Sequence, residues 1–174
     1  MNKEIDMKRW NRITNRLPVA LAALAVVATL GGPAWAQGAA HSHDAASEHT
    51  LSLDNGRKWA TDEPLRAGMD RIRGLVVSQL DAAHAGKLNA AQYKTLASKI
   101  ETEVGGIVAN CKLEPKADAM LHLVIADIGA GTDVMAGKSA KQRPVNGLAK
   151  VVDAVNQYGK HFDHPGLAPI HAGH

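Results

Sequence analysis

The sequence predicts an all-α protein, an up-down-up-down four-helix bundle, and three observations support this class. Apolar residues recur at spacings of three and four in four successive segments between residues 62 and 163. Short loops join these segments, and short loops make successive helices antiparallel. No run of alternating β-branched residues, the pattern of a strand, interrupts them.

The first 36 residues predict a cleaved signal peptide. A basic stretch ends at Arg16, an apolar run extends over residues 17–30, and Ala34-Trp35-Ala36 is the small-residue pattern that precedes signal-peptidase cleavage. The apolar run is shorter than the roughly 20 residues of a membrane-spanning helix. We therefore expect cleavage after Ala36 and a periplasmic or secreted mature protein without a membrane anchor.

The positive net charge of the chain comes entirely from the predicted signal peptide. It holds five basic and two acidic residues, which account for the whole formal net charge of +3, so residues 37–174 are formally neutral. A protein that binds nucleic acid or an anionic membrane needs a cluster of Lys and Arg, and the mature chain has no such excess. The single cysteine, Cys111, also excludes an internal disulfide.

The first helix is predicted over about residues 63–85. Asp62 or Thr61 caps it, Pro64 fits its first turn, and Gly86 ends it. Residues 37–61 before it are rich in Ala, His, Ser, Asp and Gly, and we expect a flexible N-terminal segment. The apolar stripe of this helix is Leu65, Met69, Ile72, Val76, Gln79 and Ala83.

The second helix is predicted over about residues 90–110. Asn89 and Gln92 resemble a capping box at its start. Gly105 and Gly106 lie inside it and predict a close helix contact or a local kink. Its stripe is Tyr93, Ala97, Ile100, Val104, Ile107 and Cys111.

Prolines begin the last two helices. Pro115 begins the third, which Gly137 closes, and Pro144 leads into the fourth. The bundle is therefore assigned to residues 62–163. Because Pro165 and Pro169 cannot continue a helix, residues 164–174 are predicted to be an extended, histidine-containing C-terminal tail. The stripes are Ala117, Leu121, Val124, Ile128 and Met135, then Leu148, Val151, Val155, Tyr158 and Phe162.

The predicted topology brings sulfur and imidazole side chains to one end of the bundle. The starts of the first and third helices share this end with the ends of the second and fourth. Thiolate, thioether and imidazole groups favour Cu(I), and to a lesser degree Zn(II). Alternatively, the sulfur residues are core packing and the His122 side chain pairs with Asp118. The candidate ligands are Met69, Cys111, Met120, His122, His161 and His164.

Seven of the nine histidines lie in or beside the two terminal segments. Imidazole binds Cu(II) and Zn(II), and histidine-rich tracts do so without a fold. The alternative is that these residues are solvated polar groups. The histidines before the bundle are His41, His43 and His49, and those at its end are His161, His164, His171 and His174.

Several short stretches carry a family resemblance. They are residues 52–59, 65–69, 72–73, 110–113, 117–122 and 161–165, together with Asp62. Together they resemble a small family of uncharacterised proteobacterial exported proteins. The resemblance implies an architecture similar to cytochrome b562 and cytochrome c′ bundles, and an association with copper and heavy-metal resistance.

The same resemblance raises the question of haem. Met69 and His161 occupy places comparable to the axial pair of the b562-type bundle. Covalent attachment needs two cysteines, so only non-covalent haem remains, and we rank it below copper.

Three functions are therefore carried forward. The first is a periplasmic metal-binding or metal-tolerance accessory protein, with copper ahead of zinc. The alternative is a non-catalytic interaction or structural module whose partner would contact Trp59, a tryptophan outside the helices. The third is the non-covalent haem bundle. No enzyme is predicted, because the chain holds no Ser-His-Asp order, no H-E-x-x-H and no phosphate-binding glycine loop.

Overall fold

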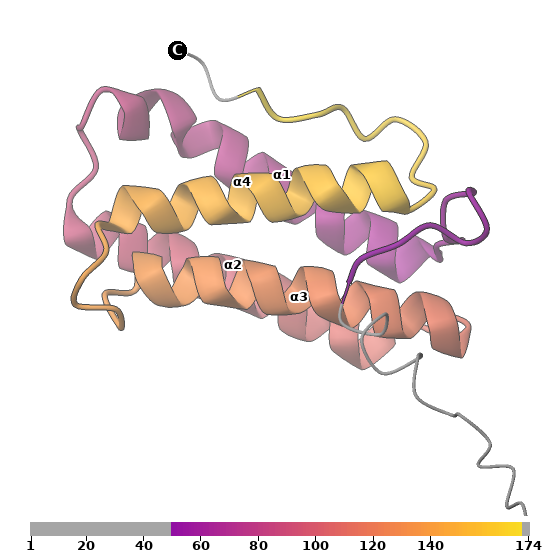
Figure 1. The fold of residues 1–174 in the computed structure, drawn as a ribbon. Helices are drawn as coiled ribbons and strands as arrows, with labels where there is room; N and C mark the ends of the chain where they lie inside the picture. The colour runs from indigo at the N-terminus through magenta and orange to yellow at the C-terminus, as the bar shows by residue number, and fades with distance from the viewer. Residues whose placement is uncertain (1–49, 172–174) are drawn as a thin grey trace, which may run out of the picture. The chain divides into compact units, whose positions relative to one another are not determined.

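The computed structural model describes residues 50–171, and these form an all-α four-helix bundle (Figure 1). Each helix packs against its neighbours in sequence, and α1 also meets α4. The predicted fold class is therefore confirmed. The proposed signal peptide and His41, His43 and His49 lie outside the described residues. The helices are α1 (Glu63–His84), α2 (Ala90–Asn110), α3 (Pro115–Met135) and α4 (Pro144–His161).

Side-chain caps begin the first two helices as predicted. The Asp62 carboxylate accepts a hydrogen bond from the Leu65 N–H at 3.0 Å. Asn89 and Gln92 form a reciprocal capping box, with both hydrogen bonds at 2.9 Å. These bonds satisfy N–H groups that have no partner within the helix.

Glycines follow two of the helices where the chain must turn. Gly86 and Gly137 have φ angles of 64° and 78°, a left-handed conformation that glycine adopts without a steric penalty. Pro115 and Pro144 occupy the first positions of α3 and α4. Among the helices of residues 50–171, none is long and apolar enough to cross a membrane.

Most residues of the apolar stripes that the spacing predicted form the core, whereas Gln79, Val104 and Cys111 are only half-buried. Buried side chains of all four helices form one cluster, which Phe162 and Ile170 join from the segment after α4. The largest buried side chains are Leu65, Met69, Ile72, Ile100, Ile107, Leu121, Ile128, Met135, Leu148, Tyr158 and Phe162.

Close helix contact occurs at glycines other than the pair singled out from the sequence. A Cβ atom on Gly147 would lie 2.5 Å from the Gly131 carbonyl oxygen, so α3 and α4 touch through their backbones here. Gly105 and Gly106 would meet nothing within 4 Å, and α2 is continuous through them. The predicted close contact at these two residues is therefore wrong, because they lie on the outer side of α2.

The segments that flank the helices pack on the bundle. A tight turn at Asn55 and Gly56 pairs Asp54 with Arg57. The chain then reaches α1, while the segment after α4 is extended and runs back along the bundle, as the yellow trace in Figure 1 shows. Long-range contacts thus hold residues 51–61, where the composition predicted flexibility.

We predict that Gly147→Ala lowers the free energy of unfolding by about 1–3 kcal/mol, because the added Cβ would force α3 and α4 apart. Chemical denaturation measures the change. Gly129→Ala is the matched control in α3: its Cβ would meet nothing within 4 Å, so it should stabilise by about 0.5–1 kcal/mol. Equal effects of the two substitutions would contradict this packing.

Candidate functional site

Hydrogen bonds join the four helix ends that were predicted to meet. The Lys112 N–H donates to the second carboxylate oxygen of Asp62 at 2.6 Å, which ties the α2–α3 loop to the start of α1. The Trp59 N–H donates to the His161 carbonyl, and the Asp163 N–H donates to the Trp59 carbonyl, both at 2.8 Å. The predicted shared end is therefore present.

Trp59 packs against its own chain at this end. Its side chain is half-buried beside the core, and its indole N–H donates to the Ser52 carbonyl at 2.6 Å. The Ser52 hydroxyl lies 3.7 Å from the Met120 sulfur, and the Lys58 ammonium donates to the Gly159 carbonyl at 2.7 Å. A partner protein was suggested because the Trp59 side chain needs a surface to pack on, and residues of its own chain provide that surface.

Cys111 lies half-buried at the end of α2. Burial raises the pKa of its thiol above the ordinary value, and the negative charges of Asp62 and Asp118 raise it further. The thiolate is the form that binds metals and reacts with electrophiles. Cys111 is thus kept mainly as a thiol at neutral pH.

His122 and His161 each have one ring nitrogen held by the backbone. The His122 Nδ1 lies 2.9 Å from the Asp118 carbonyl oxygen, with the Asp118 carboxylate at 3.4 Å. The His161 Nδ1 lies 2.8 Å from the Gln157 carbonyl oxygen. Because Nδ1 must carry the proton in these bonds, the Nε2 lone pair of each neutral ring is left available.

His164 has both ring nitrogens engaged. Its Nδ1 lies 3.1 Å from the Tyr158 hydroxyl, and its Nε2 lies 3.3 Å from the Asp70 carboxylate. The side chain is only 4% exposed, while Tyr158 is fully buried and stacks on Phe162 with ring centroids 5.1 Å apart. Burial raises the pKa of Tyr158, so its hydroxyl stays protonated and can donate to His164.

The two candidate methionines are core residues. Met69 is completely buried and Met120 is 9% exposed. Met69 and His161, the pair compared with the haem ligands of b562-type bundles, differ in their surroundings. Met69 lies inside the core, whereas His161 is half-buried at the C-terminal end of α4. Within residues 50–171, no three or more His, Cys, Asp or Glu side chains are placed to hold a metal ion. The candidate ligands share an end of the bundle without forming one cluster there.

The C-terminal segment connects α1 with α4. The Asn156 side chain accepts from the Ile170 N–H at 2.8 Å and donates to its carbonyl at 3.0 Å, and the Arg73 guanidinium donates to the Ala168 carbonyl at 2.7 Å. Ile170 is 4% exposed. His171 consequently lies beside Val155 and Asn156 of α4, so the C-terminal segment carries it away from the end of the bundle where α4 ends.

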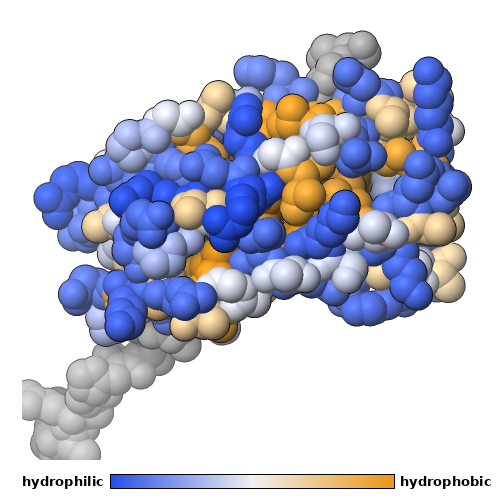
Figure 2. Space-filling model, turned by 180° about the vertical axis from the view of Figure 1, so that it is seen from behind, coloured by the Kyte–Doolittle hydropathy of each residue, from blue (hydrophilic) through white to orange (hydrophobic). Residues whose placement is uncertain are grey.

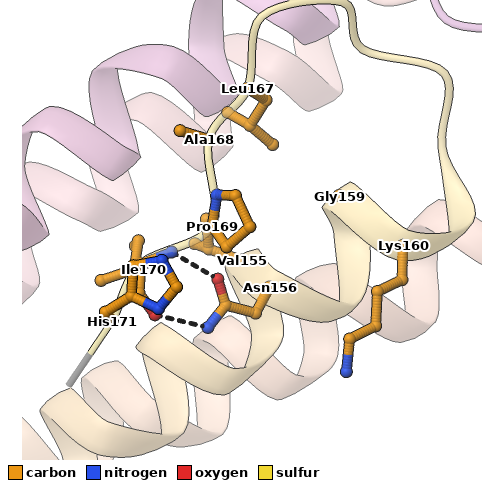
Figure 3. A pocket seen from close by; sticks show the side chains of 9 residues that line it. All are labelled: Val155, Asn156, Gly159, Lys160, Leu167, Ala168, Pro169, Ile170 and His171. Carbon is orange, nitrogen blue, oxygen red and sulfur yellow. Dashed lines mark hydrogen bonds between the residues drawn. The ribbon is translucent and has the colours of Figure 1, made fainter.

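A cavity of about 220 Å³ lies between α4 and this segment (Figure 3). Val155, Leu167 and Ile170 supply apolar walls, and Lys160 and His171 lie toward its ends. The sequence reasoning missed it. The signal that could have indicated it is the pair of apolar residues Leu167 and Ile170 within an otherwise polar tail, at a spacing that lets both dock.

The opposite side of the bundle, formed by α1 and α2, is partly apolar. Figure 2 shows hydrophobic residues gathered between hydrophilic ones on this face. A groove there is lined by Leu75 and Gly74, and the Arg71–Glu103 ion pair lies in it at 2.6 Å. Val77 is 41% exposed nearby on α1. α1 and α2 thus expose some apolar side chains to solvent on this face.

Comparison of the chain with models of protein families, with curated proteins and with solved structures finds no match. The class is therefore defined by the fold alone: a four-helix all-α domain whose terminal segments pack on the bundle.

Tyr158→Phe is expected to lower the free energy of unfolding by about 1–3 kcal/mol, because the buried His164 nitrogen loses its donor. Thermal or urea denaturation measures this. Tyr93→Phe is the control, since Tyr93 is also buried but its hydroxyl makes no hydrogen bond within residues 50–171, and its effect should stay within about 0.5 kcal/mol. A Tyr158 variant as stable as the Tyr93 variant would show that the bond contributes nothing.

Asp118→Asn should lower the pKa of the Cys111 thiol, because a negative charge that disfavours the thiolate is removed. Alkylation by iodoacetamide between pH 7 and pH 10 measures it, and the variant should react faster at the lower pH values. Asp127→Asn, an exposed change on the same helix, should leave the alkylation profile unchanged. If the unmodified protein and both variants had identical alkylation profiles, Asp118 would not be a cause of the raised pKa of Cys111.

Proposed function

We propose that this protein is an exported, non-catalytic accessory protein that captures a metal ion, copper in preference to zinc, through histidines beside its bundle. The support begins with His41, His43 and His49, which provide three imidazoles within nine residues. Imidazole nitrogens are ligands for Cu(II) and Zn(II) at neutral pH. The described part of the bundle contributes a scaffold and single ligands rather than a complete site.

The observation that carries the proposal is how residues 52–59, which follow these histidines in the sequence, are held on the bundle. Ser52 touches the sulfur of Met120, and Trp59 pairs with the end of α4, so the start of the segment is held at the end of the bundle that also carries Cys111. In the sequence, His49 is three residues before Ser52 and His41 is eleven residues before it.

Two histidines of the bundle are suited to complete a coordination sphere. His122 is exposed and His161 is half-buried, and each has its Nδ1 proton directed to a backbone carbonyl. A ligating histidine commonly has this arrangement, because the second hydrogen bond fixes the ring and leaves Nε2 for the metal. His164 is a poor candidate by the same reasoning, since both of its nitrogens already have partners.

Removing His41, His43 and His49 together is expected to weaken Cu(II) binding at least about tenfold, because the main group of imidazole ligands is lost. Calorimetric titration of the mature protein, prepared without a tag, measures the affinity, and Zn(II) is titrated in parallel. Binding should also weaken below about pH 6, where imidazole becomes protonated.

The matched control is His84→Ala, which removes an exposed histidine at the far end of α1 and should leave the affinity unchanged. A Cys111→Ser variant tests the thiol with Cu(I). If the unmodified protein binds neither Cu(I), Cu(II) nor Zn(II) more tightly than about 10 µM, the proposed function is wrong.

A further inference from the structure

The outward face of α3 is apolar where the outward face of α4 is polar. On α4, exposed polar residues recur at spacings of three and four: Lys150, Asp153, Gln157 and Lys160. On α3, the residues outside the core with the same kind of spacing are Ala119, Leu123, Ala126 and Ala130. The three alanines are exposed and Leu123 is half-buried. α3 therefore has one apolar face in the core and a second that the described part of the chain leaves uncovered.

Charged residues of opposite sign stand at the two ends of this second face. The same spacing leads to Lys116 at the start of α3 and to Asp133 near its end, and both are exposed. Within residues 50–171, Lys116 makes no ion pair, and Asp133 pairs with Lys138 through one carboxylate oxygen at 2.7 Å. We call these six residues the α3 seam: Lys116, Ala119, Leu123, Ala126, Ala130 and Asp133.

The α3 seam is symmetric about its centre. Its spacing of 3-4-3-4-3 is that of a coiled-coil contact line, and its centre falls between residues 124 and 125. Lys116 and Asp133 lie equally far from this centre, about 13 Å at 1.5 Å per residue. A two-fold axis through the centre, perpendicular to the helix, places the Lys116 position of one copy opposite the Asp133 position of the other. The charges of the seam are thus complementary to those of a second, antiparallel seam.

We propose that α3 is the interface of an antiparallel homodimer in which the α3 seams of two copies of this chain pack against each other. Lys116 of one copy pairs with Asp133 of the other, and the symmetry forms this ion pair twice. A parallel pair of helices would place two Lys116 side chains together at one end and two Asp133 side chains at the other, and like charges disfavour that arrangement. The charges therefore select both the partner and its orientation.

The apolar residues of the seam also match under this symmetry. Ala119 of one copy lies opposite Ala130 of the other, and Leu123 lies opposite Ala126. Each layer then holds no more than one large side chain, so the two helices approach closely and remove the alanines and Leu123 from water. The layers between the two ion pairs thus contain only apolar side chains.

This interface is separate from the proposed metal function. His122 and Asp127 flank the α3 seam on opposite sides, each next to a seam residue, so neither occupies a layer. The histidines that carry the metal proposal precede α3 in the sequence. Loss of metal binding and loss of dimerisation are therefore distinguishable outcomes.

The first test measures the dimer by sedimentation equilibrium of the mature protein. EDTA and a reductant are present, which exclude dimers held by a metal ion or by a Cys111 disulfide. The unmodified protein should dimerise with a Kd below about 500 µM, and Ala126→Glu should weaken the dimer at least about tenfold, because it places a carboxylate in the central layers. Ala149→Glu, at an exposed alanine of α4, is the matched control and should leave Kd unchanged. A Kd above about 500 µM for the unmodified protein, or equal effects of the two substitutions, would overturn the proposal.

The second test reverses the charges at the ends of the seam. Lys116→Glu and Asp133→Lys should each weaken the dimer at least about fivefold, because each creates two pairs of like charges. The double variant restores both ion pairs in the antiparallel arrangement and should dimerise like the unmodified protein. The contact of Asp133 with Lys138 is exposed, so its loss should change the stability of the fold little. A double variant that dimerises no better than the single variants would contradict the antiparallel seam.

The third test reads the register by disulfide formation in a Cys111→Ser background. A mixture of the Ala119→Cys and Ala130→Cys variants should form a disulfide between the two chains under mild oxidation, because these positions lie opposite each other. Neither variant alone should do so, since the two copies of position 119 lie about 16 Å apart along the helices, too far for a disulfide. Cross-linking of the Ala119→Cys variant with itself, as readily as in the mixture, would overturn the antiparallel register.

Discussion

The structure depends on how α1 and α4 are joined, because they are the two neighbouring helices that no loop connects. The extended C-terminal segment bridges them. Arg73 of α1 and Asn156 of α4 both hold its backbone, and His164 lies between Asp70 of α1 and Tyr158 of α4. The bonds of Asn156, Tyr158 and His164 are partly buried and satisfy polar groups that water reaches poorly, so they favour one position for the segment. The cavity exists as a consequence of that position.

Hydrogen bonds also determine which histidines have a ring nitrogen that could bind a metal ion. His164 is committed to Tyr158 and Asp70, so it contributes to stability. Within residues 50–171, His122 and His161 each have one ring nitrogen without a hydrogen-bond partner. Cys111 is held as a thiol by burial and by neighbouring carboxylates. The proposed metal capture therefore rests on the histidines that precede Thr50, with the bundle as their anchor.

The helices and their caps could be predicted because their causes are local. The spacing of Leu65, Met69 and Ile72 identifies a buried face, and Asn89 with Gln92 satisfies N–H groups one turn away. Close approach at Gly131 and Gly147 could not be predicted, since a helical glycine looks the same in the sequence whether a neighbour touches it or solvent does. The sequence pointed instead to Gly105 and Gly106, where an added Cβ atom would meet nothing within 4 Å.

By itself the sequence determined the class of fold, the boundaries of four amphipathic helices and the end of the bundle at which they meet. The tertiary structure alone decided that Trp59 is covered by its own chain, that His164 is a buried hydrogen-bonding residue and that the C-terminal segment encloses a cavity. Each of these outcomes depends on a partner distant in sequence. Periodicity and capping report interactions within about one helical turn, and so carry no information about such partners.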